Sequence, residues 1–134
     1  MRTIVLSAGQ GIDLDGYNKL LIKCPKRKKR IIELYKDYFK STKITIVLGY
    51  RAINVMHNFP NFDYIYNKNW AIYGNSYSLG LALTNEPCYV VSGDLIFDKK
   101  IINKLDKIDG NIIVCKNNEN RSTKSVNVEL TNDN

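Results

Sequence analysis

A loop of small residues follows the first apolar run of the chain and precedes an isolated lysine. The run covers residues 3–6, the loop reads Ser7-Ala8-Gly9-Gln10-Gly11, and Lys19 follows. Two glycines flanking one residue let the backbone turn tightly and bring its N–H groups close to an anion. A lysine nearby adds a mobile positive charge. We expect residues 7–11, called here the phosphate loop, to wrap a phosphate; the alternative is an ordinary tight turn after a strand.

A single acid stands at the end of another apolar run. Asp94 follows Ser92 and Gly93, directly after residues 88–91. A carboxylate in this position is suited to hold a divalent cation that bridges to the phosphates of a nucleotide. Because one carboxylate binds magnesium weakly, the substrate phosphates would have to complete the shell. The alternative role of Asp94 is to cap the next turn.

Length and composition indicate one domain, residues 1–134, with a sizeable core. No apolar stretch is long enough to span a bilayer, and the N-terminus lacks the layout of a secretory signal, so we expect a cytoplasmic protein without membrane contacts. Cys24, Cys88 and Cys115 are widely spaced and accompanied by one histidine, His57. They predict neither a disulfide framework nor a zinc site.

The chain is basic, with a net charge of +7, which predicts anionic partners. Much of the excess lies in residues 26–30, Lys-Arg-Lys-Lys-Arg, called here the basic run. Its position predicts a solvated turn that leads into a helix. It would steer an anionic substrate, bind a polyanion, or form plain surface. No aromatic residues are interleaved with it, so nucleic acid is the partner that we least expect.

Strands and helices alternate along the chain. Short, near-continuous apolar runs predict strands at residues 3–6, 43–48, 62–66, 88–91 and 111–115. Helical spacing and cap-forming residues predict helices at residues 30–39, 50–56, 75–83 and 101–105. This order predicts a three-layer α/β fold, a Rossmann-like sheet of mostly parallel strands with helices on both faces. Residues 116–134 are expected to be polar and loosely structured, with 126–130 as a candidate late strand.

Four segments in order resemble those of the nucleotidyltransferases that activate sugars and phospho-alcohols. They are Ile4-Val5-Leu6-Ser7-Ala8-Gly9-Gln10-Gly11 with Lys19-Leu20-Leu21, Ile46-Val47-Leu48-Gly49-Tyr50, Asn75-Ser76-Tyr77-Ser78-Leu79 with Ala82, and Val91-Ser92-Gly93-Asp94. The Asn-x-x-Ser-Leu segment is most similar to that of phosphocholine and 2-aminoethylphosphonate cytidylyltransferases. The resemblance runs from residue 1 to about residue 105 and implies a GT-A-like nucleotidyltransferase fold.

The resemblance also implies a reaction and residue roles. CMP would pass from CTP to a small phospho-alcohol or phosphonate, with release of pyrophosphate. The phosphate loop would hold the triphosphate and ribose, and Lys19 would neutralise charge on the phosphates. Asn75 and Ser78 would lie against the base or sugar, and Asp94 would hold Mg²⁺. A sugar-1-phosphate nucleotidyltransferase that uses another nucleoside triphosphate is the alternative enzyme.

The chain departs from the family pattern in sequence and in length. Asp13 and Asp15 stand where the family usually has an arginine, and Asn18 replaces the proline before the signature lysine. Family members continue well past this length, with a second metal-binding acid that Asp133 replaces poorly. The resemblance therefore implies that the C-terminal part of the fold is missing. A non-catalytic nucleotide-binding domain, fused to or associated with a larger enzyme, stays open as a third interpretation.

Overall fold

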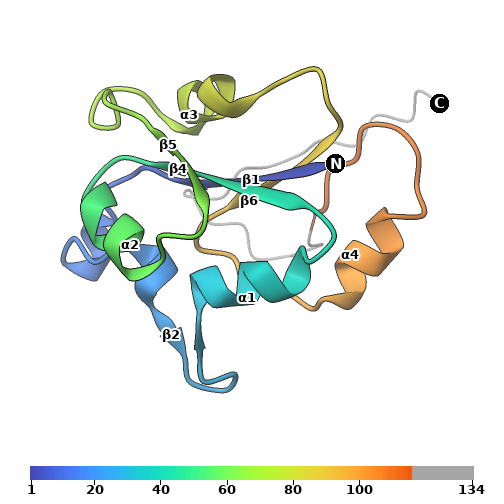
Figure 1. The fold of residues 1–134 in the computed structure, drawn as a ribbon, viewed down its shortest axis with the longest axis horizontal. Coiled ribbons are helices and arrows are strands. Elements are labelled where there is room, and N and C mark those ends of the chain that lie inside the picture. The colour runs from blue at the N-terminus through green and yellow to red at the C-terminus, as the bar shows by residue number, and fades with distance from the viewer. Residues whose placement is uncertain (116–134) are drawn as a thin grey trace.

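The computed structural model describes residues 1–115, which form a four-stranded parallel sheet (Figure 1). The spatial order is β5-β4-β1-β6, so the first strand of the chain lies inside the sheet. The strands are β1 (Arg2–Ser7), β4 (Lys43–Leu48), β5 (Asp63–Tyr66) and β6 (Cys88–Ser92). The runs of β-branched and apolar residues that predicted strands suit a parallel sheet that is covered on both faces.

The register aligns the carboxyl ends of the strands at one edge. Ser7 of β1 pairs with Leu48 of β4, and Leu6 pairs with Ser92 of β6. Leu48 in turn pairs with Tyr66 of β5. The loops that follow β1, β4 and β6 therefore leave the sheet side by side, which is where parallel α/β folds bind ligands.

Helices cover both faces of the sheet (Figure 1). Helices α1 (Ile31–Tyr38), α2 (Ala52–Asn58) and α4 (Lys100–Leu105) contribute to one core, and α3 (Asn75–Ala82) contributes to the other. Successive strand residues alternate between these cores, since Val5 points to the first while Ile4 and Leu6 point to the second. The predicted three-layer α/β fold is confirmed.

Two local features differ from the sequence-based prediction. The basic run does not lie wholly in a turn, because β2 (Lys23–Cys24) and β3 (Lys29–Arg30) pair as an antiparallel hairpin. Residues 111–115 form no strand and are exposed, so the strand predicted there is wrong. Their apolar character favours a strand, but no described strand pairs with them, and the pairing decides whether such a segment forms one. The candidate strand at residues 126–130 and the predicted polar tail lie outside the described residues.

None of the helices within residues 1–115 combines the length and the apolar character that crossing a bilayer requires.

Candidate functional site

The two predicted catalytic side chains meet at the carboxyl edge of the sheet. Lys19 begins the 3-10 turn η2 (Lys19–Leu21), and Asp94 lies in the turn after β6. Their side chains form an ion pair with 2.7 Å between Lys19 Nζ and Asp94 Oδ2, although 75 positions separate them in the sequence. About two fifths of each side chain is exposed, so both are open to a ligand.

The Asp94 carboxylate is held by two neighbours. Lys19 contacts Oδ2, and Ser92 Oγ donates a hydrogen bond to Oδ1 at 2.7 Å. Partial burial alone would raise the pKa of Asp94, but the hydrogen bonds from Lys19 and Ser92 and the charge of Lys19 outweigh it and hold the pKa below its usual value. The carboxylate is therefore ionised at neutral pH, as a ligand for a cation must be.

The phosphate loop starts where β1 leaves the sheet. Ala8 is buried and its carbonyl accepts a hydrogen bond from Tyr50 N at 2.9 Å, while Gly9 and Gln10 are exposed. Gly11 has φ +62°, a left-handed conformation that glycine adopts without strain. A Cβ built on Gly11 would lie 3.8 Å from Lys19 Cε. The loop and the Lys19 side chain are thus neighbours.

Two glycines outside the predicted site, Gly49 and Gly93, allow close backbone and side-chain approaches at the carboxyl edge of the sheet. A Cβ on Gly93 would lie 2.7 Å from Ser7 Cβ, and one on Gly49 would lie 2.6 Å from the Ala8 carbonyl oxygen and 2.3 Å from Trp70 Cβ. Such distances are too short for real side chains, so both positions require glycine. The sequence shows these glycines after apolar runs, but only the fold shows what they approach.

The two acids near the phosphate loop lie in the next turn. Asp13 is exposed within the 3-10 turn η1 (Ile12–Leu14), and Asp15 is exposed just after it with φ +50°. Gly16 follows, covered by the Tyr50 ring. Both acids are therefore exposed to solvent.

The two polar residues predicted to contact the nucleotide differ in exposure. Asn75 is the first residue of α3 and is exposed. Ser78 is 1% exposed, and its hydroxyl accepts a hydrogen bond from Asn67 Nδ2 at 3.0 Å. Asn67 is fully buried and its Oδ1 also accepts from the backbone of Asn69. This geometry provides a structural role for Ser78, and its contact with a nucleotide stays a prediction.

Replacing Ser78 with alanine is expected to lower the free energy of unfolding by about 1–3 kcal/mol, because the buried amide of Asn67 loses its acceptor. Urea unfolding measures the loss. Ser76→Ala, an exposed change in the same helix, is the control and is expected to stay within about 0.5 kcal/mol. Equal stability of both variants would contradict the structural role.

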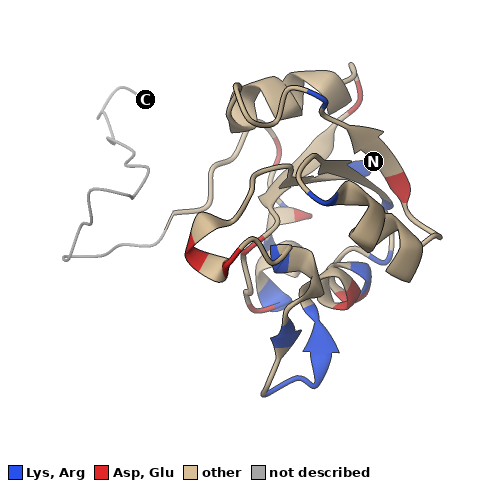
Figure 2. Cartoon of the chain, turned by 90° about the vertical axis from the view of Figure 1, so that its left-hand side faces the viewer, with Lys and Arg blue, Asp and Glu red and all other residues tan. Residues whose placement is uncertain are grey.

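The hairpin of β2 and β3 projects from the domain and carries much of the basic charge (Figure 2). Three of the five basic side chains contact the fold. Arg27 donates to Tyr38 Oη, Lys29 pairs with Asp37 at 2.5 Å, and Arg30 lies over the Phe59 ring. For the side-chain ammonium groups of the other two, Lys26 and Lys28, the described part of the chain offers no ion-pair or hydrogen-bond partner.

Replacing both Lys26 and Lys28 with glutamine should slow nucleotide association a few-fold at low salt if the basic run steers anions, with no difference at high salt. Stopped-flow binding at two ionic strengths measures this. A Lys40→Gln, Lys104→Gln double variant removes the same charge from exposed positions outside the hairpin. An identical salt dependence in both double variants would reduce the basic run to plain surface.

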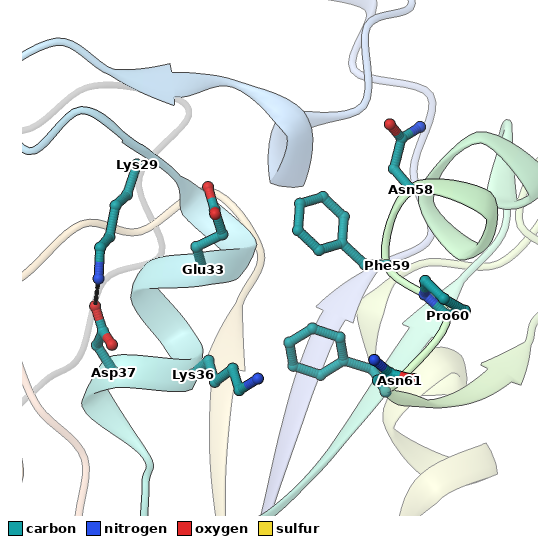
Figure 3. Close-up of a pocket in the computed structure, with 9 residues that line it drawn as sticks. Lys29, Glu33, Lys36, Asp37, Asn58, Phe59, Pro60 and Asn61 are labelled. Carbon is teal, nitrogen blue, oxygen red and sulfur yellow. Dashed lines mark hydrogen bonds and ion pairs between the residues drawn. The ribbon is translucent and has the colours of Figure 1, made fainter.

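A groove of about 400 Å³ lies away from the predicted site, between α1 and the loop after α2 (Figure 3). Phe59 faces it from the loop, and the Lys29–Asp37 ion pair lies on its other side. Phe62 also lines the groove. None of the predicted site residues lines it. Lys19 and Asp94 lie instead at the open carboxyl edge of the sheet.

Comparison with known proteins supports the interpretation of the fold. No protein-family model matches the chain, and no curated protein matches its sequence. Among solved structures, it is similar to CTP:phosphocholine cytidylyltransferase from Streptococcus pneumoniae, with a TM-score of 0.55 and 26% sequence identity. The match covers 69% of this chain and 44% of that one, so this chain spans less than half of its neighbour's length. The likeness and the sheet topology together support a nucleotidyltransferase-like fold for this chain.

Proposed function

We propose that this chain carries a Mg²⁺-dependent cytidylyltransferase site, which transfers CMP from CTP to a small phospho-alcohol or phosphonate and releases pyrophosphate. The observation that carries the proposal is the contact between Lys19 and Asp94 beside the phosphate loop. It joins a cation for phosphates and a carboxylate for a metal ion at the edge where such folds bind ligands. The similarity to a cytidylyltransferase supports the same class of chemistry.

The reaction needs positioning and charge neutralisation more than a side-chain nucleophile. An oxygen of the acceptor's phosphate or phosphonate attacks the α-phosphorus of CTP, and a new P–O bond forms. The bond from the α-phosphorus to the bridging oxygen breaks, and the electron pair leaves with pyrophosphate. The exposed backbone of Gly9 and Gln10 would bind the triphosphate, and Lys19 would offset the charge that builds up on it.

The residues at this edge fit a magnesium ion that the substrate helps to bind. Within residues 1–115, no group of three or more His, Cys, Asp or Glu could hold a metal ion. Mg²⁺ commonly binds through one or two carboxylates together with substrate phosphates, and ionised Asp94 meets that need. Asp94 would hold the ion, which when bound neutralises charge on the phosphate oxygens of CTP.

Calorimetric titration with CTP, UTP, GTP and ATP, with and without Mg²⁺, tests the proposal directly. Selective, magnesium-dependent binding of CTP is the expected result. Preference for another nucleotide would favour the sugar-1-phosphate enzyme class. Binding without any metal dependence would favour a non-catalytic nucleotide-binding domain, and the absence of nucleotide binding would overturn the proposal for this chain.

The acceptor is identified by pyrophosphate release with CTP and candidate anions. Phosphocholine and 2-aminoethylphosphonate each combine a phosphorus-bound oxyanion with a cationic nitrogen, and a sugar 1-phosphate lacks that nitrogen. Turnover with at least one of the first two and none with the third is expected. The reverse pattern would contradict the proposed acceptor class.

A further inference from the structure

Tyr35 lies in the middle of α1, but its hydroxyl reaches the turn that carries Asp94. The residue is fully buried. Its Oη lies 2.7 Å from the Ser92 carbonyl oxygen and 2.9 Å from the Leu95 carbonyl oxygen, which compete for its single proton, and it accepts a hydrogen bond from Leu95 N at 3.1 Å. One side chain below the sheet thus engages three backbone groups of the turn.

Packing alone does not require this hydroxyl. A phenylalanine at position 35 would fill nearly the same space in the core. Phe39, one helical turn further along the chain, packs in the same core without a hydroxyl group. A buried hydroxyl costs free energy unless it forms hydrogen bonds, and Tyr35 satisfies that need only through the turn. Burial also raises the pKa of Tyr35, so the hydroxyl keeps the proton that it donates.

The turn itself has few other attachments. Asp94 and Leu95 are exposed. Apart from the pairing of Ser92 with Leu6 in the sheet, the backbone hydrogen bonds of the turn run from Gly93 N to the Leu6 carbonyl at 2.8 Å and from Leu95 N to the Ser92 carbonyl at 3.3 Å. Tyr35 contacts the residues on both sides of Asp94 and therefore restrains the backbone that carries the carboxylate.

We infer that Tyr35 is a positioning residue, whose hydroxyl holds the Ser92–Leu95 turn so that Asp94 is preorganised beside Lys19. The inference rests on the proposed function, since it assigns Asp94 the metal-binding role. Tyr35 touches no substrate and acts only through the turn. Preorganisation of this kind matters because a carboxylate that must first be ordered binds a cation less tightly.

The test compares the wild-type protein with Tyr35→Phe and Tyr64→Phe. Tyr64 is the matched control because its hydroxyl also donates to a backbone carbonyl, that of Phe59, in a loop away from the turn. Amide hydrogen exchange of Leu95 is measured by NMR, and CTP affinity is measured with and without Mg²⁺. Circular dichroism and urea unfolding establish that each variant folds.

Tyr35→Phe is expected to speed Leu95 exchange by about three- to tenfold, the loss expected for one hydrogen bond. It should lower CTP affinity in the presence of Mg²⁺ and leave the affinity without Mg²⁺ unchanged. Tyr64→Phe should change neither quantity. The combined result would identify a positioning role that general destabilisation does not explain.

Unchanged Leu95 exchange in Tyr35→Phe, or equal acceleration in both variants, would overturn the inference. So would faster exchange with no change in the magnesium-dependent affinity. If the wild-type protein binds no CTP, the proposed function fails, and Leu95 exchange alone decides whether Tyr35 holds the turn. A Tyr35→Phe variant that does not fold would also overturn the inference, because the hydroxyl would then support the whole core.

Discussion

Asp94→Ala and Lys19→Ala are each expected to lower nucleotidyl transfer by at least about 10²- to 10³-fold while the fold stays intact. The first change removes the carboxylate at the proposed magnesium site, and the second removes the cation beside the phosphate loop. Their ion pair is well exposed, so its loss should cost little stability. Pyrophosphate release at saturating CTP and acceptor measures the effect, and circular dichroism checks the fold.

The chain supplies a matched control for this pair. Lys43 and Asp63 form another exposed ion pair, with 2.9 Å between Nζ and Oδ2, at the amino ends of β4 and β5. Lys43→Ala and Asp63→Ala remove the same charges at the opposite edge of the sheet, and we expect turnover to be unchanged. Activity that survives both Asp94→Ala and Lys19→Ala would remove these residues from the mechanism.

Gly49→Ala is expected to damage both the fold and nucleotide binding. The added methyl group would overlap the Ala8 carbonyl oxygen and the Trp70 side chain, and the backbone on both sides would have to move. Overpacking of this kind typically costs about 1–3 kcal/mol of unfolding free energy. The phosphate loop should shift as well, because the Ala8 carbonyl accepts the hydrogen bond from Tyr50 N. Urea unfolding and CTP titration measure the two losses.

Gly80→Ala is the control, because a Cβ at this position in α3 would meet no atom within 4 Å apart from its chain neighbours and the nearby backbone of its own helix. Alanine suits a helix interior better than glycine, so this variant should gain about 0.5–1 kcal/mol. A Gly49→Ala protein with the stability and CTP affinity of the wild type would contradict the steric overlap expected at this position.

Local sequence patterns were sufficient for most of the architecture. Apolar runs predicted all four strands of the sheet, and helical spacing predicted α1 to α4, each to within about two residues. The pattern failed at residues 111–115, because an apolar run becomes a strand only when another strand pairs with it. The β2–β3 hairpin was missed for a related reason, since its strands are two residues long and carry charge.

For the candidate site, too, some features have a local sequence signal and others depend on contacts between distant residues. The phosphate loop and the acid after β6 could be proposed as site candidates because glycine spacing and position after an apolar run are local features, and their roles stay predictions. The hydrogen bond between Ser78 and Asn67 could not be predicted, since Asn67 lies 11 positions away in another element, and the contact of Ser78 with a nucleotide stays a prediction. Tyr35 has the spacing of an ordinary core residue on an amphipathic helix, and no local pattern reveals what its hydroxyl contacts.

The order of strands and helices and the residue types in each loop follow from local sequence, because burial periodicity and turn chemistry act over a few neighbouring residues. Which of those loops meet depends on the tertiary structure. Parallel pairing of β1 with β4 and β6 brings Lys19 against Asp94 and leaves Gly49 and Gly93 no room for a side chain. Contacts between residues so far apart depend on how the whole sheet assembles.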